Sequence, residues 1–411
     1  MKLTRFNGGR FAAPSSKSEA QRALVCAALA DAPTEIVCPD ASRDIALMAE
    51  ALAALGATVT RTAAGFSVTP LTQPPTEARL DCGESGAVLR FLLPVVGALG
   101  VSAELHRSGR LAERPITPLT ELMQAHGCRL SAPSPEILRC SGRLRGKDYA
   151  ISGAVSSQFV SGLLLALPLL GHEIRLTLLP PTVSADYITL TRQALTRFGV
   201  VWEETANGFF LPDGQRCHAP REAVAVGGDW SGAAVWLCAG AISRPVTVSG
   251  LDVASAQPDR CILELLTRFG AEVTVQNGTI SVAAGRLRGI EAALDGCPDL
   301  LPPLTAVAAA AEGVTRFSGI GRLRWKESDR PAALTALLRR LGGRATVEGD
   351  TLTVFGGQRL HGGTVSACGD HRIAMAAALL SCLCAEPLLL SGAESVEKSY
   401  PQFWKQWEGA K

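Results

Sequence analysis

Residues 265–275 read LLTRFGAEVTV, a stretch in which a helix-like apolar pattern ends at Gly270 and alternating β-branched residues follow. Glycine is common just past a helix C-terminus, because it adopts a left-handed backbone conformation without strain. The alternation that follows is typical of a strand with one buried face. The stretch therefore predicts a helix that leads into a strand at Gly270.

The same pattern occurs five times at a nearly constant interval. Its glycines lie at positions 56, 127, 199, 270 and 342, so successive copies are 71 or 72 residues apart. A second series of segments interleaves with the first, and each member has a small or polar start that runs into an apolar helix. Its six members are anchored at Ser16, Ser85, Ser156, Ser231, Asp299 and Asp370. A fixed period of this kind indicates a repeated structural unit, here six units of two helices and several short strands.

Six such units exceed what one hydrophobic core usually holds, so the 411 residues are predicted to form two α/β domains of three units each. The last unit has no strand after its second helix, and we expect the N-terminal segment KLTRF (2–6) to supply one. The predicted domains are then 1–13 with 228–411, and 14–227. The chain would cross between them near 12–14 and 226–228, which predicts a double-pass hinge with a cleft.

Charge and composition limit the partners and the compartment. Lys and Arg number 40 against 38 Asp and Glu, and the net charge of +2 gives no reason to expect nucleic acid or a membrane surface as a partner. Twelve Cys occur without a CxxC pair, which indicates buried thiols in a reducing compartment rather than a disulfide framework or a metal site. Because no signal peptide and no bilayer-spanning stretch is recognisable, we expect a soluble cytoplasmic protein.

Basic residues lie at predicted helix starts and loop tips. A helix N-terminus offers free N–H groups and a partial positive charge, which attract phosphate or carboxylate. Arg binds such groups in bidentate geometry, and Lys supplies a point charge. The cations concerned are Lys17, Arg22, Arg90, Arg114, Lys326, Arg330, Arg372 and Lys398. In a nearly neutral chain, this placement predicts a site for a small polyanion.

Ten short motifs resemble those of the 5-enolpyruvylshikimate-3-phosphate synthase family in order and spacing. They are PSSKSEAQRA, CGESGAVLRF, ERPI, SSQF, SADYI, GDWSGAA, the PD at 298–299, RWKESDR, GDHRIAMA and EKSYPQFW. The combination of KESDR, DHRxAM and SSQF is highly specific, and the likeness runs from about residue 10 to residue 407. It implies an α/β fold of two domains, each with three βαβαββ units arranged as an inside-out α/β barrel.

The resemblance also implies an activity. Members of the family transfer the enolpyruvyl (carboxyvinyl) group of phosphoenolpyruvate to the 5-hydroxyl of shikimate 3-phosphate and release phosphate, in aromatic amino-acid biosynthesis. The partners implied are these two small anions, without nucleic acid or membrane, and neither a metal nor an organic cofactor is used. We expect a monomer. Both substrates carry phosphate and carboxylate, which explains why charge gathers in RLRWKESDR at 322–330.

Matched position by position, the resemblance implies three overlapping sets of site residues. The set for phosphoenolpyruvate is Lys17, Gly86, Arg114, Gln158, Arg330, Arg372 and Lys398. The set for shikimate 3-phosphate is Lys17, Ser18, Arg22, Ser156, Ser157, Gln158, Ser184, Tyr187, Asp299 and Lys326. The catalytic set is Lys17, Asp299, Glu327 and His371, in which Glu327 handles the proton at the methylene carbon. Which of Asp299, Glu327 and Lys17 takes the proton of the attacking hydroxyl stays open.

Four residues depart from the pattern of the family, namely Glu84, Ala87, Asp186 and Arg322. An additional carboxylate at 84 or 186 would repel an anionic ligand if it faced the site. The resemblance also implies that the herbicide glyphosate occupies the phosphoenolpyruvate site, where the missing Cβ of Gly86 leaves room. Sensitivity to glyphosate stays open, because Glu84 and Ala87 change the surroundings of Gly86.

Three alternative functions fit this sequence less well. The related enolpyruvyl transferase that acts on UDP-N-acetylglucosamine would carry a reactive Cys in the loop matching RSGRLAERP, where this chain has none. A catalytically silent anion-binding homologue is the second alternative, and the presence of Asp299, Glu327 and His371 argues against it. A purely structural repeat protein would have polar helix starts without the set of Arg and Lys residues.

Overall fold

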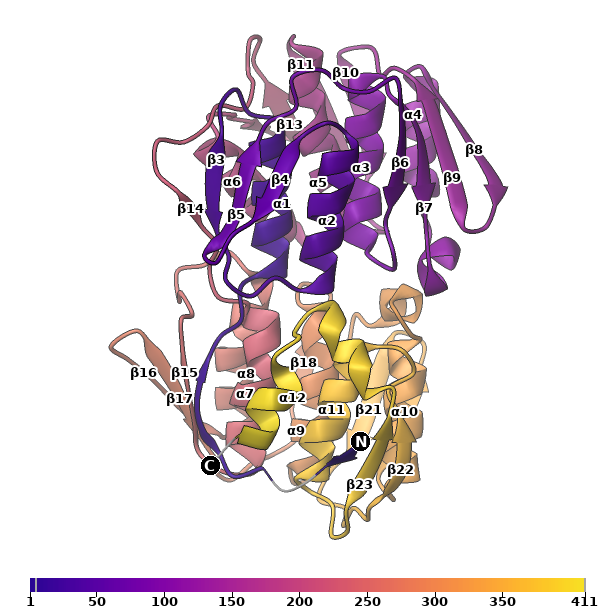
Figure 1. The fold of residues 1–411 in the computed structure, drawn as a ribbon. Coiled ribbons are helices and arrows are strands. Elements are labelled where there is room, and N and C mark those ends of the chain that lie inside the picture. Colours follow the sequence, from indigo (N-terminus) through magenta and orange to yellow (C-terminus); the bar gives the residue numbers. More distant parts are fainter. Residues whose placement is uncertain (4–5, 410–411) are drawn as a thin grey trace. The chain divides into compact units, whose positions relative to one another are not determined.

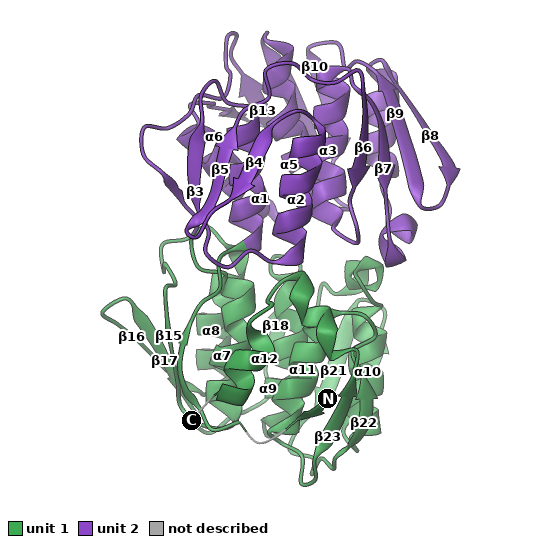
Figure 2. Cartoon of the chain, viewed as in Figure 1, with its two compact units in different colours: residues 1–16, 227–411 green, residues 17–226 purple. Residues whose placement is uncertain are grey.

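The computed structural model describes residues 1–3 and 6–409, and the chain divides into two compact units. Unit 1 comprises Met1–Ser16 and Gly227–Lys411, and unit 2 comprises Lys17–Val226. Figure 1 shows the elements along the chain, and Figure 2 colours the two units separately. The chain leaves unit 1 after Ser16 and returns to it at Gly227.

Unit 2 contains three four-stranded sheets, in the strand orders β14-β3-β5-β4, β6-β7-β9-β8 and β10-β11-β13-β12. In each sheet the first two strands are parallel and the remaining neighbours are antiparallel. The strands are β3 (Thr34–Val37), β4 (Thr58–Arg61), β5 (Gly65–Thr69), β6 (Glu77–Asp81), β7 (Ser102–His106), β8 (Cys128–Ser134), β9 (Ile137–Gly142), β10 (Asp148–Ser152), β11 (Ile174–Leu179), β12 (Glu203–Thr205), β13 (Gly208–Leu211) and β14 (Val224–Ala225). The helices are α1 (Lys17–Ala28), α2 (Arg43–Ala54), α3 (Gly86–Leu99), α4 (Thr117–Ala125), α5 (Ser157–Ala166) and α6 (Ala185–Arg197).

Unit 1 repeats this plan with two four-stranded sheets, β2-β15-β17-β16 and β18-β19-β21-β20, and one three-stranded sheet, β1-β23-β22. The strands are β1 (Lys2–Leu3), β2 (Gly9–Ala12), β15 (Val246–Ser249), β16 (Glu272–Gln276), β17 (Thr279–Ala283), β18 (Glu291–Ala293), β19 (Val314–Ser318), β20 (Arg344–Glu348), β21 (Thr351–Phe355), β22 (Gly363–Ser366) and β23 (Leu388–Ser391). The helices are α7 (Trp230–Ile242), α8 (Ile262–Phe269), α9 (Leu301–Ala310), α10 (Arg330–Arg340), α11 (His371–Ser381) and α12 (Phe403–Gly409).

The chain termini and the two crossing segments complete sheets that begin elsewhere in the sequence. Strand β1 pairs antiparallel with β23, with Leu3 opposite Leu388, so the prediction that the N-terminal segment closes the last unit is confirmed. Thr4 and Arg5 of that segment lie outside the described residues. Strand β2 precedes α1 but pairs with β15 of unit 1, and β14 precedes α7 but pairs with β3 of unit 2. Each crossing strand therefore lies in the sheet of the unit that the chain is leaving.

The five glycines of the repeat follow α2, α4, α6, α8 and α10, as the sequence predicted. Their φ angles lie between +81° and +104°, in the left-handed region. A side chain at any of them would be strained, so glycine is what lets each helix end there and a strand follow. The left-handed backbone conformation at these five positions thus explains why glycine recurs there every 71 or 72 residues.

The first helix of each repeat lies in the core, and the sheets lie outside. Helix α7 is buried from Trp230 to Ala241, and α9 and α11 are buried almost throughout. In contrast, β19 alternates exposed and buried residues, which is typical of a sheet with one solvated face. This arrangement is the predicted inside-out α/β barrel. Among the described residues, no helix combines the length and the apolar character that crossing a bilayer requires.

The cysteines behave as the sequence predicted, with one exception. All twelve are free thiols, eight of them are buried, and three are partly buried. Cys368 is exposed, because it lies in the turn between β22 and α11.

Candidate active site

Arg330, the first residue of α10, is the centre of a cluster of charges in unit 1. Its side chain is 2% exposed and forms ion pairs with three carboxylates. Nη1 lies 2.6 Å from Asp299 Oδ1, Nη2 lies 3.0 Å from Glu327 Oε2, and Nε lies 2.9 Å from Asp370 Oδ2. Burial alone would lower the pKa of Arg330, but Asp370, Glu327 and Asp299 raise it above its ordinary value. Arg330 is therefore a permanent cation.

Two lysines join this cluster, one from the segment just before α10 and one from the end of the 3-10 helix Ala393–Lys398. Lys398 Nζ lies 3.2 Å from Glu327 Oε1, so Glu327 is held between Lys398 and Arg330. Lys326 Nζ lies 3.4 Å from Asp299 Oδ1. Burial would raise the pKa of Asp299, but the charges of Lys326, Arg330 and Arg372 outweigh it and hold that pKa well below its ordinary value. Asp299 is therefore ionised at neutral pH.

The N-terminus of α11 supplies the remaining residues of this cluster. Asp370 caps the helix by accepting a hydrogen bond from the backbone N–H of Arg372 at 2.9 Å, and it also accepts one from the hydroxyl of Ser328 at 3.0 Å. His371 is buried, with Nδ1 3.8 Å from Asp370 Oδ1. Arg372 Nη1 donates to the carbonyl oxygen of Ser231 at 2.6 Å. The structure thus brings together every residue that the sequence predicted in this unit.

In unit 2, a second cluster forms where several helices begin. Lys17, the first residue of α1, lies 3.0 Å from Asp44 Oδ2 near the start of α2. Gln21 Nε2 donates to the backbone oxygen of Asp44 at 3.0 Å and contacts Ser85 Oγ at 3.4 Å, just before α3. These contacts hold Lys17 beside the N-terminus of α2 and Gln21 beside the N-terminus of α3.

Arg22 extends this cluster toward α6. Its guanidinium donates to the backbone oxygens of Ser18 at 2.7 Å and Tyr187 at 3.1 Å. It also donates to Thr191 Oγ1 at 2.7 Å and lies within 3.5 Å of Ser161 Oγ. Burial lowers the pKa of Arg22 to about 10, so the side chain is still charged at neutral pH. The acceptors of Arg22 are all neutral.

The first turn of α3 faces two further guanidinium groups. A Cβ added to Gly86 would lie 3.2 Å from Arg90 Nη1, from Arg114 Nη1 and from Gln158 Oε1. Arg90 Nη1 donates to Gln158 Oε1 at 2.7 Å, and Arg90 Nη2 donates to the backbone oxygen of Pro115 at 3.1 Å. Gly86, Arg114 and Gln158 therefore lie together, as predicted, and the missing side chain of Gly86 makes this approach possible.

The predicted serines and tyrosine lie at the N-termini of α5 and α6. Ser156 caps α5, because its Oγ accepts a hydrogen bond from the N–H of Gln158 at 3.3 Å, and Ser157 is buried at the first helical position. Ser184 directly precedes α6 with φ +50°, and the carbonyl of Tyr187 in the first turn accepts from Arg22. These residues belong to the cluster in unit 2.

Comparison with known proteins agrees with the motifs. The family described as EPSP synthase (3-phosphoshikimate 1-carboxyvinyltransferase) matches residues 5–407. The chain belongs to the EPSP synthase family. The 3-phosphoshikimate 1-carboxyvinyltransferase of Clostridium kluyveri is 35% identical over 401 residues, which cover 97% of this chain and 94% of that protein. The enzyme of the same name from Clostridium beijerinckii is 34% identical with the same coverage.

Solved structures show the same fold. EPSP synthase from Acinetobacter baumannii superposes with a TM-score of 0.81 at 23% identity, over 100% of this chain and 97% of that one. The enolpyruvyl transferase NikO from Streptomyces tendae gives a TM-score of 0.77 at 20% identity, over 100% of this chain and 96% of that one. These structures confirm the predicted fold class, and the match over residues 5–407 confirms the predicted family.

Arg90 and Asp370 belong to the clusters, but neither was predicted to bind a particular substrate or to take part in catalysis. Arg90 was recognised only as a cation at a helix start, although it binds Gln158 and faces Gly86. Asp370 was recognised only as a helix start, although it binds Arg330. The sequence showed Asp370 as a polar residue before a helix, followed by His and Arg. Its contact with Arg330 depends on tertiary structure and could not be predicted from this pattern.

The residues that depart from the family pattern have local contacts. Glu84 lies against the backbone at Gly109, where a Cβ would overlap its carboxylate, and Gly109 has φ +51°. Asp186 is exposed in the first turn of α6, where the helix dipole favours a negative charge. Arg322 donates to the backbone oxygen of Asp295. The direct contacts described for the two clusters do not depend on these side chains.

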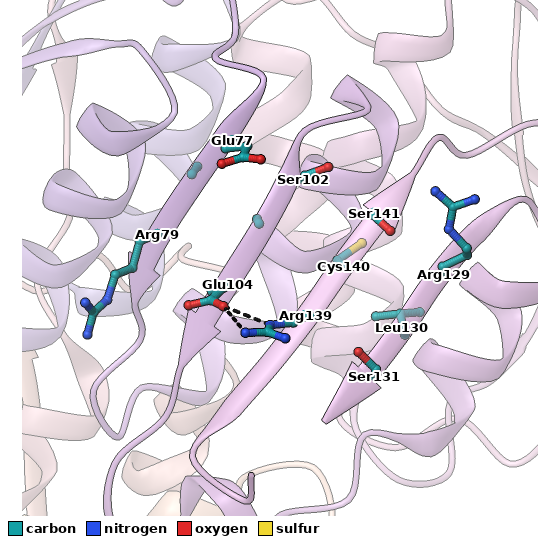
Figure 3. A pocket seen from close by; sticks show the side chains of 12 residues that line it. Glu77, Arg79, Ser102, Glu104, Arg129, Leu130, Ser131, Arg139, Cys140 and Ser141 are labelled. Carbon is teal, nitrogen blue, oxygen red and sulfur yellow. Dashed lines mark hydrogen bonds and ion pairs between the residues drawn. The ribbon is translucent and has the colours of Figure 1, made fainter. Parts of the chain in front are cut away.

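A hollow in unit 2 lies over strands β6, β7, β9 and β8 and is separate from the predicted residues (Figure 3). Glu104 and Arg139 from neighbouring strands form an ion pair of 2.7 Å across it. Both side chains are more than a third exposed, so the pair contributes little to stability. We assign no function to this hollow.

Proposed function

We propose that this chain transfers the enolpyruvyl group of phosphoenolpyruvate to the 5-hydroxyl of shikimate 3-phosphate and releases inorganic phosphate. The membership of the whole chain in the EPSP synthase family supports this proposal, and so does one observation of the site. Glu327, a carboxyl group 9% exposed, is held between Arg330 and Lys398. Such a group combines a proton carrier with two cations that suit a phosphate or a carboxylate.

The reaction needs a proton on the methylene carbon of phosphoenolpyruvate while the 5-hydroxyl attacks the neighbouring carbon and loses its own proton. Phosphate then leaves, and the methylene carbon gives its proton back. We propose Glu327 as the group that delivers and retrieves this proton, with His371 nearby. We propose Asp299 and Lys17 as the candidates, besides Glu327, for accepting the hydroxyl proton.

The charges around Asp299 favour a role that depends on ligands. Lys326, Arg330 and Arg372 hold its pKa well below the ordinary range, so it is a weak base in the unliganded protein. Substrate anions that neutralise these cations would raise this pKa and strengthen the base. Asp299 would then accept a proton most readily when both substrates are bound.

The proposed binding residues follow the resemblance. For phosphoenolpyruvate they are Lys17, Gly86, Arg114, Gln158, Arg330, Arg372 and Lys398. For shikimate 3-phosphate they are Lys17, Ser18, Arg22, Ser156, Ser157, Gln158, Ser184, Tyr187, Asp299 and Lys326. The guanidinium groups and the helix N-termini among them supply the donors that phosphate and carboxylate require.

The test is phosphate release by the purified protein with both substrates, with each substrate omitted in turn, and mass spectrometry of the product. We expect stoichiometric phosphate and an enolpyruvyl ether only when both substrates are present. Phosphate release from phosphoenolpyruvate alone would indicate a phosphatase. Binding of both anions without turnover would indicate the silent homologue.

A cytoplasmic location, a monomeric state and a hinge at the two crossings remain predictions. The twelve free thiols support a reducing compartment. Light scattering would test the monomer. Small-angle X-ray scattering with and without both substrates would test the hinge.

A further inference from the structure

Asp259 is a buried carboxyl group to which neither the family motifs nor the proposed mechanism gives a role. It lies in the 3-10 helix Pro258–Cys261 and is 1% exposed. Its Oδ2 accepts a hydrogen bond from Ser231 Oγ, whereas Oδ1 has no hydrogen-bond partner in the part of the chain that the structure describes. A buried carboxylate with half of its acceptors unused is costly, so its presence calls for a physical explanation.

Ser231 connects Asp259 to the candidate active site. It is the second residue of α7, and its hydroxyl donates to Asp259 while its carbonyl oxygen accepts from Arg372 Nη1 at 2.6 Å. Among the described residues, this is the only hydrogen bond of the Arg372 guanidinium, and its buried Nε has no partner. The orientation of this guanidinium therefore depends on Ser231.

We propose that Asp259 is a positioning residue, which holds Ser231 so that the guanidinium of Arg372 points at an anionic ligand. The proposal rests on the proposed function, because Arg372 is assigned there to phosphoenolpyruvate. Asp259 itself touches neither substrate in this proposal. It acts on the ligand only through Ser231 and Arg372.

A merely structural role for Asp259 is unnecessary for α7. Asp229 caps the helix by accepting from the N–H of Gly232 at 2.7 Å. Gln257 accepts from the N–H of Trp230 at 2.9 Å and donates to the backbone oxygen of Gly228 at 2.8 Å. The start of α7 is thus held by two other side chains, and the contact that Asp259 adds is the one to the residue that binds Arg372.

The protonation state of Asp259 decides whether it can position Ser231 without offsetting the positive charge of Arg372. Burial, Asp299 and Asp229 raise the pKa of Asp259, Ser231 and Arg372 lower it, and the net result is a pKa of about 7. The thiol of Cys297 is also close enough for the charge of Asp259 to raise the pKa of that thiol. A protonated Asp259 leaves the charge of Arg372 available to the ligand, and an ionised one offsets part of it. Anion affinity at this site should therefore fall as the pH rises through about 7.

The experiment compares Asp259→Asn, Ser231→Ala and the double variant with the wild type between pH 6 and 9. Inorganic phosphate affinity is measured by calorimetry, and KM for phosphoenolpyruvate by phosphate release. Ser231→Ala should lower the phosphate affinity and raise KM for phosphoenolpyruvate, each by roughly tenfold, the usual cost of a lost hydrogen bond near a charge. Asp259→Asn, which mimics the protonated acid, should keep the affinity and remove the part of its pH dependence that comes from Asp259, leaving only that of phosphate itself. The double variant should bind phosphate no more weakly than Ser231→Ala, because both substitutions act on the same interaction between Asp259 and Ser231.

The control is Asp252→Asn, which changes an exposed carboxylate in the segment between β15 and the 3-10 helix Pro258–Cys261. It should leave phosphate affinity, KM and their pH dependence unchanged. The inference is wrong if Asp259→Asn retains the pH dependence of the wild type, if the double variant binds phosphate more weakly than Ser231→Ala, or if phosphate does not bind. These readouts are separate from turnover. An inactive wild type that still shows the phosphate effects would overturn the proposed function and leave the link from Asp259 to Arg372 supported.

Discussion

Arg22 in unit 2 and Arg330 in unit 1 are buried to the same extent but are stabilised in opposite ways. The exposed fraction is 3% for Arg22 and 2% for the side chain of Arg330. The acceptors around Arg22 are hydroxyl and carbonyl oxygens, and burial lowers its pKa to about 10. Arg330 is paired with three carboxylates, which raise its pKa despite burial.

This difference has a consequence for anion binding. Neutral acceptors leave the charge of Arg22 uncancelled, so it attracts a phosphate at long range even though its donors are occupied. Around Arg330 the carboxylates already balance the charge, and an entering anion must redistribute protons or ion pairs. Proton chemistry is therefore expected in unit 1, where Glu327 and Asp299 share this cation, rather than around Arg22.

Removing the two charges should give the largest measurable contrast. Arg330→Met removes an ion-pair partner from the buried Asp370 and from the partly buried Asp299 and Glu327, and we expect a loss of about 3–5 kcal/mol in the free energy of unfolding. Arg22→Met leaves only neutral acceptors unpaired and should cost roughly 1–3 kcal/mol. Urea unfolding of both variants at pH 7 measures the contrast.

A matched control for these variants is Arg316→Met, because Arg316 forms an exposed pair with Glu291 at 3.1 Å. Its cost should stay below about 1 kcal/mol. Equal costs for Arg330→Met and Arg22→Met would show that the carboxylates around Arg330 do not determine its environment.

The sequence predicted the fold that carries Arg22 and Arg330 but not the charges that surround each of them. The glycine at each helix end and the N-terminal strand were predictable, because backbone conformation and strand pairing follow from local pattern and topology. The motifs also pointed to Arg22 and Arg330 together. The opposite surroundings of the two were not predictable, since the partners of Arg22 lie up to 169 residues away in the chain.

Asp259 illustrates the same limit. Its partner Ser231 is 28 residues away, and Ser231 binds Arg372 at a distance of 141 residues. No pattern around the sequence QPDR marks such a link, because helix N-termini from three segments must first be packed together. Arg90 had a visible signal, its place at a helix start, but its contact with Gln158 depended on the packing of α3 against α5.

Glu327→Gln tests whether the carboxylates around Arg330 do proton chemistry. The amide keeps the shape of the side chain and a hydrogen-bond acceptor for Arg330 but cannot transfer a proton as an acid. We expect turnover to fall by roughly 10²-fold or more, as is usual for the loss of a general acid or base. Shikimate 3-phosphate affinity, measured by calorimetry, should stay near that of the wild type. Equal losses in affinity and turnover would assign Glu327 a binding or structural role.

Asp259 and Asp299 should give opposite dependences of stability on pH. The pKa of Asp259 is raised to about 7, so the folded state holds a proton that the unfolded state has lost above about 4. Its contribution to stability is therefore full at low pH and is lost as the pH rises toward 7. The pKa of Asp299 is lowered, so its contribution is present at neutral pH and is lost as the pH falls below about 4.

Asp259→Asn should therefore raise the melting midpoint at pH 8 by several degrees and leave it nearly unchanged at pH 4. Each kcal/mol shifts the midpoint of a domain of this size by about 2–4 °C. Calorimetric scans from pH 4 to 8, with Asp252→Asn as the control, measure the effect. A parallel curve for Asp259→Asn and the wild type would mean that Asp259 is ionised throughout.

Gly86→Ala sharpens the comparison from the side of unit 2, where the cations are crowded rather than neutralised. The added Cβ would lie 3.2 Å from Arg90 Nη1, Arg114 Nη1 and Gln158 Oε1, which is tight but involves only the ends of flexible side chains. The protein should therefore fold normally, with the two guanidinium groups displaced by a few tenths of an ångström. Glyphosate is longer than phosphoenolpyruvate, so the displacement should weaken the inhibitor by about 1 kcal/mol more than the substrate, the low end for a methyl-sized misfit. Inhibition constants set beside KM for phosphoenolpyruvate, in Gly86→Ala and in the wild type, measure this difference. Parallel changes in the two constants would show that Gly86 does not face the end of the site that the inhibitor occupies.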